Sequence, residues 1–271
     1  FDVGIAEQPA VSMAAGMARG GYRPYFAVYS TFLQRAYDQI VHDVCLQNLP
    51  VCILSDHVGL VGDDGKTHHG VLSVPMLMSI PNLTLLAPRD TRQIRQAVRA
   101  TLKLDGPCVV QYPKEGIEPY AQNVTGEPFA VGKWQTLIPG GQDAVILAYG
   151  RMTQNAIQAS ELLVQRGLSV GVIDCCSLKP LDMDCLRALF ERRAKIVTIE
   201  EGEMIGGFGS EIARVCVEEN ADAPVQIIGL ENRFITHGSV PELLRECGLM
   251  PEQLANRIEE IAGDKESSHV G

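Results

Sequence analysis

Apolar and polar positions follow two alternating patterns along the first hundred or so residues. Apolar side chains spaced three or four positions apart predict amphipathic helices, and short continuous apolar runs predict buried strands. The predicted helices cover residues 10–20, 31–46, 75–79 and 90–104. The predicted strands cover residues 24–29, 51–55, 83–87 and 108–111. Such a strand–helix alternation predicts a mostly parallel sheet covered by helices.

A second alternating unit follows a stretch without periodicity, residues 113–132, whose prolines and glycines are typical of a linker. Its predicted strands cover residues 144–148, 169–174, 196–199 and 225–229. Its predicted helices cover residues 152–166, 182–192, 209–219, 240–247 and 252–262. The chain is therefore predicted to be an α/β protein with two doubly wound, mostly parallel-sheet domains. The expected boundaries are a first domain over 1–115, a linker over 116–130, a second domain over 131–262 and a polar tail over 263–271.

Composition narrows the class of protein. Hydrophobic residues make up 46% and charged residues 21% of the chain, as in globular proteins. The formal net charge of −10 argues against a general nucleic-acid binder or a binder of anionic membranes. No run of about 18 apolar residues and no secretory signal is present, so we expect a cytoplasmic protein. The eight cysteines include no CxxC pair, which predicts free, mostly buried thiols and no metal site.

The start of the chain is unusual for a complete domain. The first residue is Phe1 and not Met, and residues 1–3 already resemble a strand that leads into a turn at Gly4. We interpret the sequence as a fragment or a processed product.

Three polar stretches follow predicted strands. They are Glu7 at the start of a helix, the segment 29–35 with its aromatic residues and Arg35, and the loop 62–70 with Asp64 and His68. In doubly wound sheets, ligands bind beyond the carboxyl ends of the strands. The three stretches together therefore predict a convergent polar site on an apolar floor.

Each of these residues also has a purely structural interpretation. Glu7 in a first helical turn is more often a capping carboxylate, and Phe32 alone is more often part of a core. His68 and His69 alone are most often ordinary loop residues. A basic helical stripe is interpreted as a solvated face, consisting of Arg89, Arg92, Arg95, Arg99 and Lys103.

Longer motifs give these residues a context. Residues 2–8 (DVGIAEQ), 29–39 (YSTFLQRAYDQ) and 59–70 (GLVGDDGKTHHG) resemble the 1-deoxy-D-xylulose-5-phosphate synthases of the transketolase family. In the second half, residues 179–182 (KPLD), 200–201 (EE) and 206–210 (GGFGS) resemble the family's C-terminal domain. The similarity extends over nearly the whole chain, and the block 29–39 is its most specific part.

The resemblance implies a pyrimidine-binding domain followed by a transketolase C-terminal domain, in an enzyme that uses thiamine diphosphate and Mg²⁺. Glu7 would hydrogen-bond the cofactor's pyrimidine ring and promote loss of the thiazolium proton, while Phe32 would stack on that ring. Tyr29 and Arg35 would lie around the pyrimidine. Tyr29 and Asp64 would border the substrate channel, where His68 would exchange a proton with the reacting carbonyl.

The implied reaction decarboxylates pyruvate and joins the two-carbon unit to glyceraldehyde 3-phosphate, on the route to isoprenoid and thiamine precursors. Three positions depart from the family pattern. Pro9 replaces a usual histidine, and the two arginines that clasp the acceptor phosphate align with His57 and Gln111. Loss of two guanidinium groups removes the strongest phosphate contacts, so a paralogous enzyme with another acceptor is a second interpretation.

The resemblance also implies parts that this sequence lacks. The family's diphosphate- and magnesium-binding domain is absent, as are the first strand and helix of the pyrimidine-binding domain. The expected assembly is a homodimer acting on small molecules. Two further alternatives are a split transketolase or 2-oxoacid dehydrogenase β-type subunit, and a non-catalytic scaffold that pairs with a homologous subunit.

Overall fold

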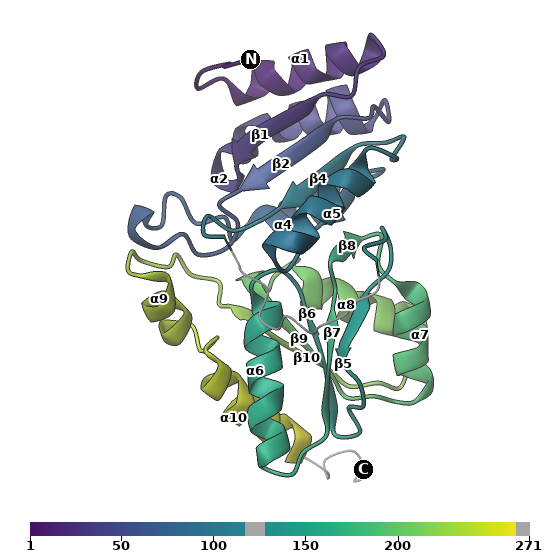
Figure 1. Cartoon of the computed structure of the whole chain (residues 1–271), viewed down its shortest axis with the longest axis vertical. Coiled ribbons are helices and arrows are strands. Elements are labelled where there is room, and N and C mark those ends of the chain that lie inside the picture. Colours follow the sequence, from purple (N-terminus) through teal and green to yellow (C-terminus); the bar gives the residue numbers. More distant parts are fainter. Residues whose placement is uncertain (117–127, 264–271) are drawn as a thin grey trace.

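The computed structural model describes residues 1–116 and 128–263. Residues 117–127, which form most of the predicted linker, and residues 264–271, in the predicted tail, lie outside this description. The described residues form two α/β units, one above the other in Figure 1. Each unit has a five-stranded sheet in which four strands are parallel and one edge strand is antiparallel. This confirms the predicted fold class.

The first unit is built around a sheet with the strand order β1-β2-β4-β3-β8. Its strands are β1 (Tyr25–Tyr29), β2 (Cys52–Asp56), β3 (Thr84–Leu86), β4 (Cys108–Gln111) and β8 (Ser177–Lys179). Its helices are α1 (Glu7–Arg19), α2 (Ser30–Leu33), α3 (Tyr37–Gln39), α4 (Ser73–Met78) and α5 (Thr91–Thr101). Shorter helical turns are η1 (Gln34–Ala36), η2 (Ile40–Cys45) and η3 (Gly62–Asp64).

The second unit has the strand order β10-β9-β6-β7-β5. Its strands are β5 (Gln135–Ile138), β6 (Ala144–Ala148), β7 (Val170–Asp174), β9 (Ile196–Glu203) and β10 (Val225–Leu230). Its helices are α6 (Met152–Gln165), α7 (Met183–Glu191), α8 (Phe208–Glu218), α9 (Val240–Glu246) and α10 (Pro251–Gly263). Strands β6, β7 and β9 are buried along nearly their whole length, which explains their unbroken apolar sequences.

Alternate residues of the central strand β6 point to opposite faces of the sheet. Val145 and Leu147 belong to a core that also contains residues of α7 and α8. Ile146 on the other face packs with residues of α6, α9 and α10. The helices therefore cover both faces of the second sheet, as the doubly wound arrangement requires.

The two units are joined by more than the linker. Strand β8, which follows β7 in the second unit, pairs antiparallel with β3 and completes the first sheet. One core cluster runs through both units and contains Ile53 and Leu85 of the first together with Leu147 and Phe208 of the second. The molecule therefore has no clean boundary in its apolar core.

Two local expectations from the sequence are wrong. The segment predicted as one helix over 31–46 is a series of α, 3₁₀ and π turns, and Tyr37 points away from the core that holds Leu33 and Ile40. Arg89 is not on a solvated face, because its guanidinium is buried against Asp174. A guanidinium is almost never buried without an anionic partner, and a helical period cannot show that such a partner exists elsewhere in the chain.

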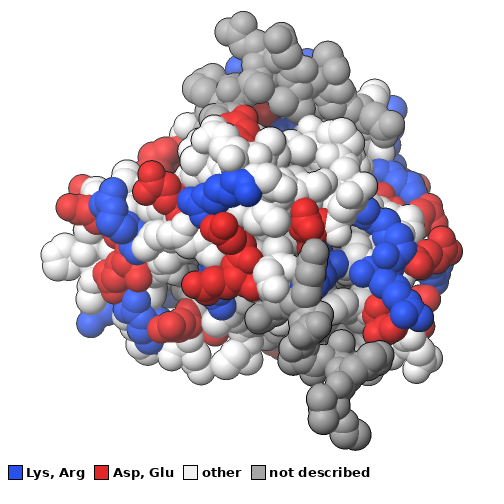
Figure 2. Space-filling model, turned by 90° about the horizontal axis from the view of Figure 1, so that it is seen from below, with Lys and Arg blue, Asp and Glu red and all other residues white. Residues whose placement is uncertain are grey.

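Surface and thiol chemistry follow simple patterns. Figure 2 shows acidic and basic side chains interspersed on the end formed by the second unit. All eight cysteines are free thiols, and six of them are buried.

Within residues 1–116 and 128–263, no helix is long and apolar enough to cross a membrane. The same residues contain no cluster of three or more His, Cys, Asp or Glu side chains able to hold a metal ion.

Candidate active site

Glu7 is the first residue of α1 and is buried, with 8% of its surface exposed. Gly4, with φ of +64°, turns the chain into this helix, and its N–H donates to Asp2 Oδ1 at 2.9 Å. The carboxylate therefore lies at the positive end of the helix dipole. Its Oε1 accepts a hydrogen bond from Arg35 Nη1 at 3.2 Å. Arg35 thus occupies one carboxylate oxygen and leaves Oε2 for a second donor.

An aromatic cluster lies beside this ion pair. Tyr29 ends β1 and Phe32 lies in α2, and their rings are stacked with centroids 5.4 Å apart. The His57 ring also stacks on Tyr29, with centroids 3.7 Å apart. The Arg35 guanidinium carbon is 5.2 Å from the centre of the Phe32 ring, within cation–π range. A half-buried aromatic face next to a buried carboxylate suits a flat, polar heterocycle.

His68 approaches the same cluster from the loop between β2 and α4. Its ring meets Phe32 edge-on with centroids 5.5 Å apart, and its Nδ1 is 3.0 Å from Thr67 Oγ1. Thr31 Oγ1 donates to Thr67 O at 3.2 Å and so ties the loop to α2. Strands β1 and β2 are parallel neighbours, so the segments after them meet at one edge of the sheet.

The structure thus brings together Glu7, Arg35 and Phe32 with Tyr29, His57 and His68. Asp64 lies on the same loop as His68, but its partner is a residue outside this cluster. Its carboxylate pairs with Lys114 at the surface, and the hydrogen bond from Lys114 lowers the pKa of Asp64.

His57 is held in a rare conformation. Its φ is +59°, a region that residues other than glycine seldom adopt. Its backbone N–H donates to Asp56 Oδ1 at 2.6 Å. Its Nδ1 lies 3.1 Å from the same oxygen, at an angle unsuited to a hydrogen bond. Backbone strain at a single residue is typical of functional sites.

Gln111 does not join the aromatic cluster. It ends β4, is buried, and its Oε1 accepts from Ser73 Oγ at 3.2 Å. Its Nε2 has no hydrogen-bond partner among the described residues. Gln111 borders a cavity of about 20 Å³ between the units, which Arg151 and Glu201 also line. A cavity of this size holds one water, which would satisfy the amide.

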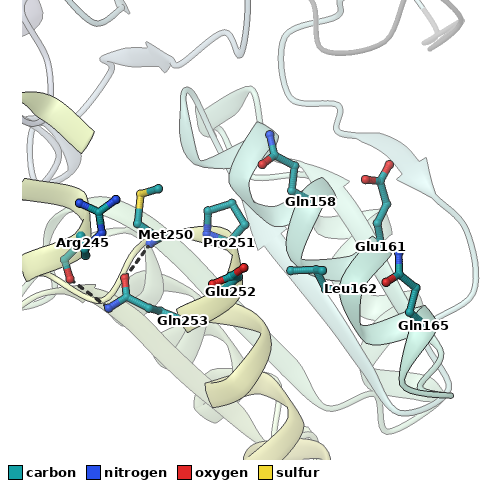
Figure 3. A pocket seen from close by; sticks show the side chains of 9 residues that line it. All are labelled: Gln158, Glu161, Leu162, Gln165, Arg245, Met250, Pro251, Glu252 and Gln253. Atoms are coloured by element: carbon teal, nitrogen blue, oxygen red, sulfur yellow. Dashed lines mark hydrogen bonds between the residues drawn. The ribbon is translucent and has the colours of Figure 1, made fainter. Parts of the chain in front are cut away.

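Two larger hollows differ in their relation to this site. A cleft of about 740 Å³ between the units contains Asp63 and Lys114, next to Asp64. A groove of about 570 Å³ contains none of the candidate residues and lies between α6 and the start of α10 (Figure 3). Its walls carry Gln158 and Glu161 on one side and Arg245 and Gln253 on the other. We therefore place the candidate site at the first sheet and not in this groove.

Sequence reasoning missed the contribution of the second unit. Glu201 at the end region of β9 accepts a hydrogen bond from Leu60 N at 2.9 Å, and His69 contacts Thr236 O at 2.9 Å. Both contacts hold the loop that carries His68. The only sequence signal is a pair of glutamates after a buried apolar strand, which is unusual because a buried carboxylate requires a partner.

Two family models match most of the chain. Residues 1–118 match the pyrimidine-binding domain of transketolase, and residues 132–254 match the transketolase C-terminal domain. The chain belongs to the transketolase family. Within it, the chain is similar to 1-deoxy-D-xylulose-5-phosphate synthases, as its sequence motifs indicate.

The synthase of Bacillus velezensis is 42% identical over 273 residues, which cover 100% of this chain and 43% of the relative. The synthase of Chlorobaculum tepidum is 43% identical, and the match covers 42% of the length of that synthase. The chain thus spans about two fifths of the length of these curated relatives.

Among solved structures, an inactive β4 tetramer of a split-gene transketolase matches with a TM-score of 0.86 and 29% identity. The match covers 98% of this chain and 84% of that one. The transketolase of Campylobacter jejuni matches with a TM-score of 0.80 at 18% identity, over 96% of this chain and 39% of that one. The second likeness shows the shared fold only.

Proposed function

We propose that this chain supplies the pyrimidine-binding half of a thiamine-diphosphate-dependent transferase resembling 1-deoxy-D-xylulose-5-phosphate synthase. The observation that carries the proposal is the buried carboxylate of Glu7, 3.2 Å from Arg35, next to the partly buried ring of Phe32 that Arg35 also contacts. Thiamine diphosphate, when bound, supplies the carbanion chemistry that decarboxylates a 2-oxo acid and transfers its two-carbon unit.

The residues of this chain fit the pyrimidine part of that cofactor. Phe32 would stack on the pyrimidine ring, and Tyr29 packs against Phe32. Glu7 Oε2 is available to accept a hydrogen bond from a ring nitrogen, and Arg35 on Oε1 keeps the carboxylate oriented. His68, whose ring makes a T-shaped contact with that of Phe32, would exchange a proton with the reacting carbonyl. Tyr29 and Asp64 border the space where pyruvate and an aldehyde would enter.

The diphosphate and Mg²⁺ need a further domain. Among the described residues no cluster of acidic or histidine side chains can hold the metal. A split-gene transketolase with the same two-domain plan is described as an inactive β4 tetramer. We therefore propose that activity requires a diphosphate-binding domain, on the same polypeptide or on another, together with the two domains described here, in a homodimer of complete active units. A cytoplasmic location is consistent with the free thiols of this chain.

The residues expected to contact the substrate bear on the choice between two classes of acceptor. The family resemblance implies glyceraldehyde 3-phosphate. The imidazole of His57 and the amide of Gln111, in place of two guanidinium groups, favour an unphosphorylated aldehyde. The nearby cations Arg35 and Lys114 already pair with Glu7 and Asp64.

The test is turnover of pyruvate by this chain combined with a diphosphate-binding partner domain, in the presence of thiamine diphosphate and Mg²⁺. Glyceraldehyde 3-phosphate and glyceraldehyde are compared as acceptors. Transfer to either aldehyde supports the proposed enzyme, and the ratio of the two kcat/KM values identifies the acceptor class. If calorimetry detects no cofactor binding by the assembly, the chain is instead a non-catalytic pairing scaffold.

A further inference from the structure

The loop over residues 59–70, here called the His68 loop, is closed at its base by its own backbone. Gly70 N donates to Gly59 O at 2.8 Å, and Gly59 N donates to Gly70 O at 3.3 Å. In Figure 1 this loop connects β2 with α4 and lies beside α9 of the second unit. The position of His68 therefore depends on two sets of contacts. One set holds the base of the loop, and the other is made by residues in the interior of the loop.

Glu201 of the second unit holds one side of the base. Its Oε1 accepts from Leu60 N at 2.9 Å and from Arg151 Nη1 at 3.1 Å, and the carboxylate is buried. The approach is so close that a Cβ on Gly59 would lie 2.6 Å from Glu201 Cδ. The Leu60 side chain is fully buried in the core cluster of the second unit, together with Ile146.

His69 holds the interior of the loop. Its Nδ1 accepts from Val61 N at 3.1 Å, and a backbone N–H can only donate. The proton of the neutral ring is therefore on Nε2, which donates to Thr236 O of the second unit at 2.9 Å. One buried imidazole thus joins two parts of the chain that are 167 residues apart. A further backbone bond runs from Glu203 N to Val71 O at 3.0 Å, just beyond the loop.

The adjacent histidines therefore have different tasks. His69 is buried and faces the second unit, whereas His68 faces Phe32 in the first unit. Glu7 and Phe32 lie on α1 and α2, outside the loop. The residues expected to bind cofactor and the residue expected to move a proton are thus held by different parts of the molecule.

We propose that Glu201 and His69 are positioning residues through which the second unit sets the place of His68 beside the Phe32 ring. Its catalytic consequence rests on the proposed function above. Its structural content does not, because the position of the His68 loop can be measured without turnover.

The test compares hydrogen–deuterium exchange of the His68 loop in the wild-type chain, Glu201→Ala, Glu201→Gln and His69→Phe. We expect Glu201→Ala and His69→Phe to raise exchange in peptides covering the loop at least about tenfold, because each removes buried anchoring hydrogen bonds. Exchange in peptides of α1 and β1 should stay within about twofold of wild type. Glu201→Gln keeps an oxygen that can accept from Leu60 N, so it should restore most of the protection.

Ile258→Ala on α10 is the matched control for general destabilisation. It removes buried apolar contacts in the same core cluster without touching the loop's hydrogen bonds. The proposal is overturned if the loop exchanges equally fast in this control, if exchange in α1 rises in parallel, or if Glu201→Gln loses as much protection as Glu201→Ala.

Kinetics in the assembly with a diphosphate-binding partner supply the second readout. Glu201→Ala should lower kcat at least about tenfold while the KM for thiamine diphosphate changes less than about threefold, because the pyrimidine contacts lie outside the loop. If kcat falls and the KM for thiamine diphosphate rises by the same factor in Glu201→Ala, the positioning role is overturned. If the wild-type assembly shows no turnover, the proposed function fails while the exchange experiment still decides the anchoring role.

Discussion

Glu7 and Arg35 form the central charge pair of the candidate site. The side chain of Glu7 is 10% exposed and that of Arg35 is 54% exposed, so the pair lies at the border between protein and solvent. Such a pair has little effect on stability by itself. Its value is geometric, because a guanidinium on Oε1 fixes the direction in which Oε2 faces. The effect of changing Glu7 should therefore appear in chemistry and not in folding.

The first prediction concerns this difference between the effect of Glu7 on turnover and its effect on stability. Glu7→Gln keeps an oxygen for Arg35 but removes the charge that a protonated ring nitrogen would need, so turnover should fall by about 100-fold or more. The thermal unfolding midpoint should shift by less than about 3 °C. Turnover of the assembly and circular dichroism during heating are the measurements. Glu191→Gln, at an exposed position of α7 outside the candidate site, is the control, and a Glu7→Gln variant with more than a tenth of wild-type turnover would contradict the role of Glu7.

A second prediction concerns Glu200, which is fully buried beside the start of α8. Its carboxylate accepts from Phe208 N at 3.0 Å and Gly209 N at 2.9 Å, yet burial raises its pKa from 4.5 to about 7. Between these values the folded chain binds more protons than the unfolded chain, so this group makes the free energy of unfolding fall as pH rises. The stability that Glu200 provides is complete below about pH 4.5 and is lost as pH passes about 7.

Glu200→Gln removes the titrating proton. Over pH 5 to 7 its free energy of unfolding should fall less than that of the wild type, by on the order of 1–3 kcal/mol. Urea denaturation at both pH values measures this difference. Glu218→Gln at the exposed end of α8 is the matched carboxylate-to-amide control. If Glu200→Gln and Glu218→Gln both keep the wild-type slope, Glu200 does not titrate in this range.

At the scale of elements, side chains that satisfy helix ends also connect strands to helices. Asp90 caps α5 by accepting from Gln93 N, and Asp182 caps α7 by accepting from Cys185 N. Asp182 Oδ2 accepts in addition from Trp134 N at 3.0 Å, next to the start of β5. One buried carboxylate therefore satisfies the end of a helix and the approach to an edge strand.

The prediction for this element is a large effect from one side chain. Asp182→Ala loses the cap and leaves the buried Trp134 N–H unpaired, which should cost about 2–3 kcal/mol of unfolding free energy. Asp182→Asn keeps one acceptor oxygen and so preserves either the cap or the bond from Trp134 N, and it should cost about half as much. Urea denaturation followed by the fluorescence of the single tryptophan measures both. Asp184→Ala, at an exposed position two residues away, is the control, and an equal loss there would contradict the assignment.

The elements also show how far the sequence could predict this structure. The long apolar runs and the caps at Asp90 and Asp182 carry their own local signals, and the predicted alternation is confirmed. Strands β5 and β8 were not predicted, because they are four and three residues long and exist only through pairing with β7 and β3. The irregular turns after α2 likewise depend on tertiary contacts that a helical period does not show.

The residues of the candidate site likewise divide into those that the sequence could predict and those that it could not. Glu7, Tyr29 and Phe32 lie in motifs that are local in sequence, so they could be named before the structure. His69 was interpreted only as a loop histidine and Glu201 only as a match to the C-terminal domain, because their contacts join residues 141 or more positions apart. The chemical roles of all the site residues stay predictions.

At the scale of the whole molecule, a buried polar cluster fastens the two units together. Arg89, after β3, pairs with Asp174 at the end of β7 and donates to Gln135 Oε1 at 2.7 Å. Gln93 Nε2 donates to Asp174 Oδ2 at 2.7 Å. Burial raises the pKa of Asp174, and Arg89 opposes that shift. Arg89 is therefore the cation that offsets the burial of the Asp174 carboxylate, and Arg89 is itself also 3.4 Å from Asp90 Oδ2.

The corresponding prediction is a strong coupling between the two residues. Arg89→Leu should cost about 3–5 kcal/mol, because it leaves the Asp174 carboxylate buried without its cation. Adding Asp174→Asn should recover at least about 1 kcal/mol, so that the double variant is more stable than the sum of the single ones predicts. A double-mutant cycle measured by urea denaturation supplies the coupling energy. Additive effects would show that the pair is not coupled.

The strand β8 has a consequence for how such proteins can be recombined. A chimaera that takes residues up to the predicted linker from one homologue and the remainder from another would cut none of the helices and strands among residues 1–116 and 128–263, which makes the linker an obvious junction. Yet β8 from one parent would have to pair with β3 from the other, and Leu60 would enter a foreign core. Viable hybrids should therefore be selected by matching residues 59–71, 84–86 and 177–179 to one parent, wherever the crossover lies.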